Sequence, residues 1–115
     1  MKTLLYSPDF KERKQALCKY LDFQFGKDVR KRVMAEIHKQ ILALRERERL
    51  GLSVRDNFGI NCDYYYIVIS KNILFYRFDS RYIYIVNIYN ERKDYIYKMF
   101  GSFSQLHEEA FYQPE

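Results

Sequence analysis

The chain has 115 residues, with 20 Lys and Arg, 15 Asp and Glu, a net charge of +5, 12 Tyr, 9 Phe and no Trp. Chains divide into separate cores only beyond roughly 250 residues, so this length predicts one domain. Four Gly and two Pro exclude collagen-like and low-complexity classes, and a 48 % hydrophobic content excludes a disordered chain. No uncharged run exceeds about ten residues, whereas a bilayer needs about 18, so we expect no membrane contact and a cytoplasmic protein.

Charge and tyrosines are concentrated in different halves of the chain. Residues 1–51 carry 13 Lys and Arg against 7 Asp and Glu, whereas residues 52–115 carry 7 against 8. Nine of the 12 tyrosines lie between Tyr64 and Tyr97. A basic half therefore precedes an aromatic half.

The first half predicts a strand followed by a helix hairpin. Residues 2–6 fit a short strand, Ser7 supplies an N-cap hydroxyl, and Pro8 fits the first helical position. Apolar residues at helical spacing then predict one helix that Gly26 ends and a second helix over residues 28–51 that Asp28 caps. Because almost no loop separates the two helices, they should pack antiparallel.

The second half predicts an antiparallel sheet. Residues 52–63 have the composition of a loop, with a brief strand around residues 53–55. Three runs rich in β-branched and aromatic residues, 64–70, 73–79 and 82–89, predict strands. Two-residue turns join these runs, so we expect a meander.

The last residues predict a short helix and an acidic tail. Asp94 can cap a helix over residues 95–100 that Gly101 ends. Residues 102–115 contain three Glu and no Lys or Arg, so this segment is either loosely attached or folded against the basic helices. We therefore expect a single domain over residues 1–101 and an acidic tail over residues 102–115.

These elements define an α+β fold. An N-terminal strand and an antiparallel helix hairpin pack on an antiparallel β-meander, with a short C-terminal helix. One helical layer covers only one face of the sheet, so we expect the other face to be partly open. In the run 73–79 both alternating faces are apolar or aromatic, and an apolar open face favours a binding partner.

Motifs for catalysis, metals and cofactors are absent from the sequence. His38 and His107 are the only histidines, and neither stands at a recognised spacing from a nucleophile. Cys18 and Cys62 are 44 positions apart without a CxxC motif, which predicts free thiols in a reducing compartment. Metal-ligand spacings and a glycine-rich phosphate loop are also absent, so we expect no metal and no cofactor.

The remaining candidate surface combines cations with aromatic rings. Arg77 stands inside a predicted strand, the run 90–95 follows the last strand, and tyrosines surround both. Such a surface suits RNA, because cations pair with phosphates and rings stack on bases. It suits a protein interface equally well, because Tyr and Arg dominate interface energetics. Composition leaves these two interpretations open.

Three segments carry a family resemblance. They are YLDFQFG at residues 20–26, NILFYRFD at residues 72–79, and IVNIYNERKDY at residues 85–95. In this order and spacing they resemble the RelE/ParE superfamily of type II toxin–antitoxin toxins, and in particular its ParE-like (plasmid stabilisation protein) branch. The likeness extends over roughly residues 4–101.

RelE-like members of the superfamily are ribosome-dependent mRNA endonucleases that use Lys, Arg and Tyr side chains. Their strand cations correspond here to Tyr66, Val68 and Ile73. These replacements remove positive charge that phosphoryl chemistry needs in its transition state. For such an enzyme, with the ribosome and mRNA as partners, the resemblance implies these catalytic residues: Arg77, Arg92, Lys93 and Tyr97.

ParE-like members instead bind and poison DNA gyrase, and a cognate antitoxin neutralises them. The likeness to this branch is better at residues 76–77 and 92–95, although Asn90 and Glu91 depart from its pattern. The resemblance therefore implies a growth-arresting toxin with an antitoxin and gyrase as partners, and a non-toxic binding module as the blander alternative. The expected partner contacts are Arg77, Arg92, Lys93, Tyr95 and Tyr66.

Overall fold

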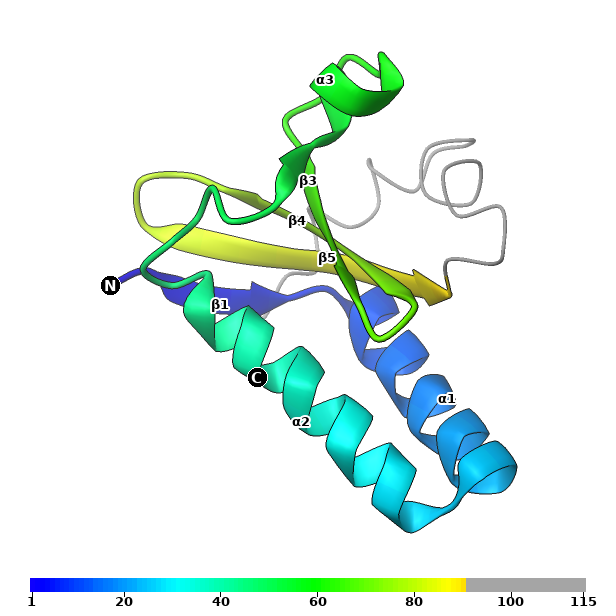
Figure 1. The fold of residues 1–115 in the computed structure, drawn as a ribbon. Coiled ribbons are helices and arrows are strands. Elements are labelled where there is room, and N and C mark those ends of the chain that lie inside the picture. The colour runs from blue at the N-terminus through cyan, green and yellow to red at the C-terminus, as the bar shows by residue number, and fades with distance from the viewer. Residues whose placement is uncertain (91–115) are drawn as a thin grey trace.

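A computed structural model describes residues 1–90 of the chain. These residues form two layers, in which a pair of long helices covers one side of a five-stranded sheet (Figure 1). The predicted helix over residues 95–100 and the acidic tail over residues 102–115 lie outside the described residues.

The elements follow the predicted order, with one addition. In chain order they are β1 (Thr3–Tyr6), α1 (Pro8–Phe25), α2 (Lys27–Ala43), β2 (Leu52–Ser53), α3 (Val54–Phe58), β3 (Tyr65–Ile69), β4 (Asn72–Phe78) and β5 (Tyr82–Asn90). The strands lie in the order β1-β5-β4-β3-β2. The predicted meander of β3, β4 and β5 is confirmed, whereas β1 pairs with β5 in parallel, so the complete sheet is mixed.

The helix hairpin begins as predicted. The hydroxyl of Ser7 accepts a hydrogen bond from the Phe10 N–H at 3.0 Å, and Pro8 occupies the first turn. Gly26 has φ +89° and separates the two helices, a backbone conformation that favours glycine. The predicted cap at Asp28 is wrong, because α2 already begins at Lys27 and the Arg30 N–H bonds to the Gly26 carbonyl at 3.1 Å.

The predicted end of the second helix at Gly51 is also wrong, because α2 ends at Ala43. The Tyr76 hydroxyl donates to the Glu48 carbonyl and accepts from the Gly51 N–H, both at 2.8 Å. This side chain from β4 therefore binds backbone groups that a continuing helix would use. A Cβ at Gly51 would lie 2.6 Å from the Tyr66 carbonyl oxygen, so only glycine fits there without a shift.

The predicted loop over residues 52–63 contains a short helix, α3, and its brief strand, β2, lies at Leu52–Ser53 rather than at residues 53–55. The Ser53 hydroxyl caps α3 by accepting from the Asp56 N–H at 3.2 Å. Gly59 ends the helix in the left-handed conformation, with φ +68°. Val54 is fully buried and fastens α3 to the sheet.

One hairpin turn is shifted from its predicted position, whereas the turn predicted at Ser80 and Arg81 is confirmed, because the Asp79 N–H bonds to the Tyr82 carbonyl at 3.0 Å across it. Ser70 and Lys71 form the turn between β3 and β4, one residue earlier than expected, and both have positive φ. This is the twist that two-residue hairpins need. Between β4 and β5 the pairing register shifts at Phe75 and Tyr76, which marks a bulge that places one additional residue in β5.

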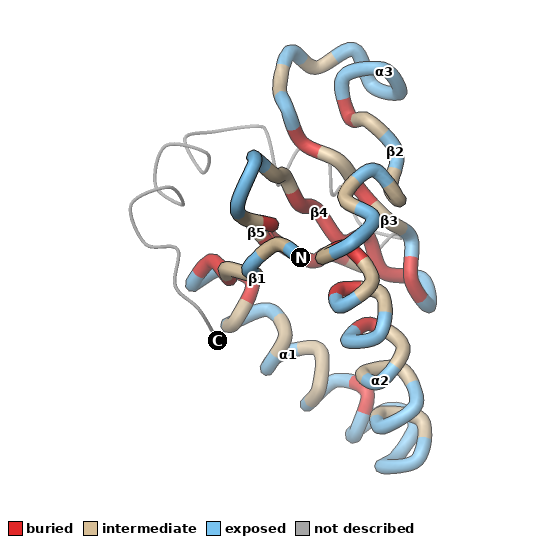
Figure 2. The backbone as a smooth tube through the Cα atoms, turned by 90° about the vertical axis from the view of Figure 1, so that its left-hand side faces the viewer, coloured by how far each residue is buried: buried red, intermediate tan, exposed pale blue. Residues whose placement is uncertain are grey.

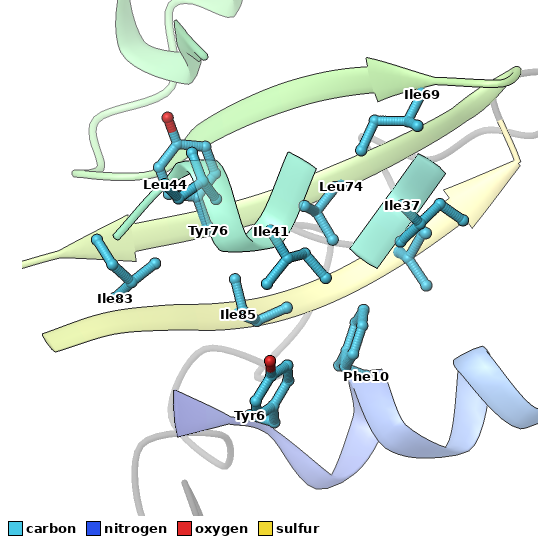
Figure 3. Packing of buried hydrophobic residues seen from close by; sticks show 11 residues of the cluster. Tyr6, Phe10, Ile37, Ile41, Leu44, Ile69, Leu74, Tyr76, Ile83 and Ile85 are labelled. Atoms are coloured by element: carbon cyan, nitrogen blue, oxygen red, sulfur yellow. The ribbon is translucent and has the colours of Figure 1, made fainter. Parts of the chain in front are cut away.

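The larger core cluster lies between the helices and the sheet (Figure 3). Phe10 from α1 and Ile37, Ile41 and Leu44 from the second helix and its end meet the strands there (Figure 3). The buried strand residues of the cluster are Tyr6, Ile69, Leu74, Tyr76, Ile83, Ile85 and Ile88. Burial of this continuous apolar layer is the main stabilisation of the fold.

The opposite sheet face holds a second buried cluster, and Val68 on the same face is 52 % exposed, which agrees with the expectation of a partly open face. Its buried members are Val54, Tyr64, Tyr66, Ile73, Phe75, Val86 and Tyr89. Figure 2 shows the corresponding central parts of β4 and β5 in the colour of buried residues. Because α3 contributes Val54 to this cluster, part of the face is already covered within residues 1–90.

Candidate functional site

The three positions that the sequence resemblance aligned with strand cations, Tyr66, Val68 and Ile73, lie on the second sheet face. Tyr66 pairs with Phe75, and Val68 pairs with Ile73, across neighbouring strands. Strand alternation directs these four side chains to the face opposite the helices. Tyr66 and Ile73 are buried, and Val68 is 52 % exposed. These positions in the described centre of the face therefore carry no charge.

Arg77 supplies a cation on the same face, at the end of the sheet where the β4–β5 hairpin turns. Arg77 and Tyr84 are direct cross-strand partners, and the guanidinium carbon of Arg77 lies 4.1 Å from the centre of the Tyr84 ring. This distance is typical of a cation–π contact. Tyr84 also packs against Tyr82, with 5.9 Å between their ring centres. Arg77 is thus presented on an aromatic platform.

Asp79 holds this platform in position. One of its carboxylate oxygens accepts the N–H groups of Arg81 and Tyr82, both at 2.8 Å, and the other accepts the Tyr84 hydroxyl at 2.7 Å. The backbone hydrogen bond from Arg81 and the Tyr84 hydroxyl lower the pKa of Asp79, so the carboxylate stays charged.

The pKa of Tyr84 shifts in the opposite direction. Burial is the largest cause that raises the pKa of Tyr84, and the hydrogen bond to the Asp79 carboxylate raises it further. The phenol therefore keeps its proton. Arg77, Asp79, Tyr82 and Tyr84 are here called the Arg77 cluster. With a cation, a fixed carboxylate and rings, it can bind a charged or aromatic group of a partner.

Of the other predicted site residues, only Tyr66 lies within the described part of the chain. Tyr66 is only 9 % exposed, because its ring packs at 5.3 Å from that of Phe58 in α3 and at 6.4 Å from that of Phe75. Tyr66 lies on the same sheet face as Arg77, because its cross-strand partner Phe75 stands two positions before Arg77 in β4, but it is buried. Within the Arg77 cluster as defined here, Arg77 is the only predicted contact. The remaining predicted site residues lie outside the described residues: Arg92, Lys93, Tyr95 and Tyr97.

One contact that the sequence did not reveal joins α1 to the second cluster. The Arg13 guanidinium carbon lies 4.2 Å from the centre of the Tyr89 ring. The Tyr89 hydroxyl accepts a hydrogen bond from the buried amide of Asn87 at 3.0 Å. No sequence signal links Arg13 to Tyr89, because the pair is separated by most of the described chain.

A second group of cations lies at the helix-covered end of β4. Lys2 and Arg49 approach the Phe78 ring, with the Lys2 nitrogen at 5.9 Å and the Arg49 guanidinium carbon at 5.4 Å from its centre. Lys2 also pairs with Glu48 at 3.6 Å, and Arg49 donates to the Tyr65 hydroxyl at 3.1 Å. These contacts fasten the segment after α2, so we assign them a structural role.

The outer surface of α2 is basic. Lys31, Arg32 and Lys39 are exposed there, and His38 is exposed beside them. Figure 2 shows exposed residues recurring along the helix. A surface of this charge attracts acidic partners over a range set by the ionic strength.

Metal-ligand clusters and helices fit to span a membrane are both absent from residues 1–90. This part of the chain contains no group of three or more His, Cys, Asp or Glu side chains that could hold a metal ion. Its helices include none that is long and apolar enough to cross a membrane.

Comparisons with known proteins identify the fold. No family model matches the chain, and no curated protein matches it. The chain is similar to a solved structure of the chromosomal ParDE TA system from P. aeruginosa, with a TM-score of 0.64 and 13 % identity. The match covers 78 % of this chain and 96 % of that chain. The predicted α+β fold, with a helix pair packed on the sheet, is therefore confirmed as the fold of that ParDE chain.

Proposed function

We propose that this chain is the toxin of a type II toxin–antitoxin system, of the ParE-like kind. It would act in the cytoplasm by binding and poisoning DNA gyrase, and a cognate antitoxin would neutralise it. The observation that carries the proposal is the shared fold, because the match covers 96 % of the ParDE chain. The segments NILFYRFD and IVNIYNERKDY, which resemble the ParE-like pattern, support the same assignment.

The Arg77 cluster supplies the described part of the proposed target contact. Its cation is held over the Tyr84 ring at 4.1 Å, and Asp79 fixes that ring through a 2.7 Å hydrogen bond. A side chain fixed before binding loses little conformational entropy when a partner binds. The proposed contacts that accompany Arg77 are Arg92, Lys93, Tyr95 and Tyr66.

The antitoxin contact is proposed for the basic helix hairpin. Lys31, Arg32 and Lys39 are exposed along α2 and would steer an acidic antitoxin segment toward it. Because this attraction is screened by salt, association with the antitoxin should slow as the ionic strength rises. The fold match to the ParDE TA system is consistent with such a partner.

A ribosome-dependent mRNA endonuclease is the second candidate function. The observation that favours it is Arg77 beside aromatic rings on the second sheet face, an arrangement that suits phosphates and unpaired bases. Against it, the positions of the family's strand cations hold Tyr66, Val68 and Ile73. Its remaining catalytic candidates would be Arg92, Lys93 and Tyr97. A non-toxic binding module is the third candidate.

Controlled expression in bacterial cells without the antitoxin tests the proposal. We expect growth arrest, filamentation and DNA breaks that depend on gyrase, with no codon-phased cuts in mRNA by primer extension. Codon-phased cuts without DNA breaks would instead establish the endonuclease, and harmless expression of the folded protein would establish the non-toxic module.

The matched variants for this experiment are Arg77→Gln and Arg81→Gln. Each removes one positive charge near the β4–β5 hairpin, but only Arg77 stacks on the platform, while the Arg81 side chain is exposed. We expect Arg77→Gln to weaken target binding at least about tenfold and therefore to restore colony formation, and Arg81→Gln to remain toxic.

A further inference from the structure

Three exposed aromatic side chains gather at the connection between α1 and α2. Phe23 is 87 % exposed, Phe25 is 59 % exposed and Tyr20 is 49 % exposed. This connection forms the end of the hairpin that projects away from the sheet (Figure 1). We call these three residues the aromatic tip. Neither core cluster includes them, and the proposed function does not use them.

The aromatic tip stands on a braced scaffold. Tyr20, Phe23 and Phe25 all belong to the last turns of α1, and the rings of Tyr20 and Phe25 meet edge to face at 6.4 Å. An ion pair between Arg30 and Asp22, with 3.3 Å between its atoms, joins the end of α1 to the start of α2. Side chains on such a scaffold lose less entropy on binding than side chains on a loop.

The exposed area is large for a chain of this size. At their observed exposures, the three side chains offer roughly 400 Å² of aromatic surface, since each such side chain has about 150–250 Å². A patch of about this area is the largest on a typical monomer and is often functional. Two such patches facing each other would bury about 800 Å² in total, which corresponds to a weak, reversible complex.

Charge distinguishes among the possible occupants of the aromatic tip. Residues 19–30 contain three Lys or Arg and two Asp, so the tip is nearly neutral. Residues 31–49 contain six Lys or Arg and three Glu, so the excess charge lies farther along the hairpin. Acidic peptides, nucleic acids and anionic membranes all favour a concentration of cations, which the tip lacks. A second copy of the chain meets little charge repulsion there.

We propose that the aromatic tip is a self-association surface that binds a second copy of this chain about a two-fold axis. In such an arrangement the same patch serves both copies, and apolar rings with mixed charges around them suit it. The tip lies at the end of the hairpin that projects away from the sheet (Figure 1), so the proposed contact does not use β4 and β5, which carry the Arg77 cluster. The proposal does not rest on the proposed function.

Sedimentation equilibrium of the full chain, made by cell-free synthesis, tests the proposal. Over about 10 µM to 1 mM we expect the average mass to rise from 14.2 kDa toward twice that value, with a dissociation constant on the order of 100 µM. Phe23→Lys should weaken the association at least about tenfold, because it places a desolvated charge in the interface. Gln15→Lys adds the same charge to an exposed position of α1 outside the tip and should associate like the wild type.

Circular dichroism and urea unfolding of both variants verify that the fold is intact. Dilution of an isotope-labelled sample, followed by NMR, should shift amide signals of residues 19–30. A wild-type chain that remains monomeric at about 1 mM overturns the proposal, as does a Phe23→Lys variant that associates normally. Phe23-dependent binding of a monomeric chain to phosphatidylglycerol vesicles would also overturn it, since a membrane would then be the occupant.

Discussion

The two faces of the sheet differ in the chemistry of their side chains. The helix-covered face is built mainly from Ile and Leu beneath α1 and α2. The opposite face holds Tyr, Phe and Asn side chains, and at one end the Arg77 cluster. Neighbouring residues Ile73 and Leu74 belong to opposite clusters. The contrast teaches that one face supplies stability, while the other combines burial with groups that can recognise a partner.

The largest effect is expected at the helix-covered face. Leu74→Ala removes a fully buried side chain from the larger cluster, and we expect the free energy of unfolding to fall by about 3–4 kcal/mol. Val68→Ala, on the second face and 52 % exposed, should cost less than about 0.5 kcal/mol. Urea unfolding measures both, and equal losses would contradict the difference in burial between Leu74 and Val68.

Gly51 lies against the Tyr66 backbone and the Tyr76 hydroxyl, and its replacement should cause the next largest loss in the free energy of unfolding. A Cβ there would lie 2.6 Å from the Tyr66 carbonyl oxygen and 2.8 Å from the Tyr76 hydroxyl, so Gly51→Ala should cost about 2–3 kcal/mol. Gly59→Ala is the control, because an added Cβ meets nothing within 4 Å and only the positive φ is strained. That strain should cost about 1 kcal/mol. A Gly51→Ala variant as stable as the wild type would contradict the close approach.

A smaller effect is expected from the Tyr76 hydroxyl. Tyr76→Phe leaves the Glu48 carbonyl and the Gly51 N–H without this partner, which should cost about 1–2 kcal/mol in urea unfolding. Because the ring stays in place, the loss should be well below that of Leu74→Ala. A loss of the same size would indicate that the hydroxyl, not the apolar packing, dominates this part of the core.

The same hydroxyl gives a pH dependence with a definite sign. Burial raises the pKa of Tyr76 from 10.0 to about 12, so above pH 10 the phenol ionises more readily in the unfolded chain than in the folded chain. The stabilisation is complete below pH 10 and is lost as the pH rises toward 12, by up to about 2–3 kcal/mol. The wild type should lose stability faster than Tyr76→Phe over this range, and identical pH profiles would contradict the assignment.

A modest stability effect is expected at the Arg77 cluster. Arg77→Gln removes a cation–π contact and should cost only about 0.5–1 kcal/mol. Thermal unfolding of this variant beside Arg81→Gln measures the difference. A much larger loss would show that Arg77 is a structural residue, and the second face would then lose its distinction as the recognition face.

Local signals explain which parts of the fold were predictable. Ser7 and Pro8 mark the start of α1, Gly26 separates the helices, and β-branched residues with short turns define the meander. Each of these signals acts within a few residues. The path of residues 44–51 after α2 could not be predicted from local signals, because its Glu48 carbonyl and Gly51 N–H bond to the Tyr76 hydroxyl, which lies 28 positions beyond Glu48. The parallel pairing of β1 with β5 is likewise a long-range contact.

The candidate site was predictable only in part. Strand alternation along the predicted run 73–79 is enough to place Arg77 on the face opposite Leu74 and Tyr76. The Asp79 turn and the Tyr84 platform required the register of β4 and β5, which the bulge alters. The burial of Tyr66 required α3, whose only signals were the capping residues Ser53 and Gly59. The aromatic tip was visible in the sequence only as helix residues, because exposure depends on the packing of the complete hairpin.

A supercoiling assay with purified DNA gyrase tests the central claim most directly. In molar excess, the full chain should inhibit supercoiling and increase the linear DNA that is released after protein digestion. Arg77→Gln should weaken this inhibition at least about tenfold relative to Arg81→Gln, which would assign the activity to the second sheet face. Normal supercoiling and no linear DNA in the presence of excess folded chain would contradict the account.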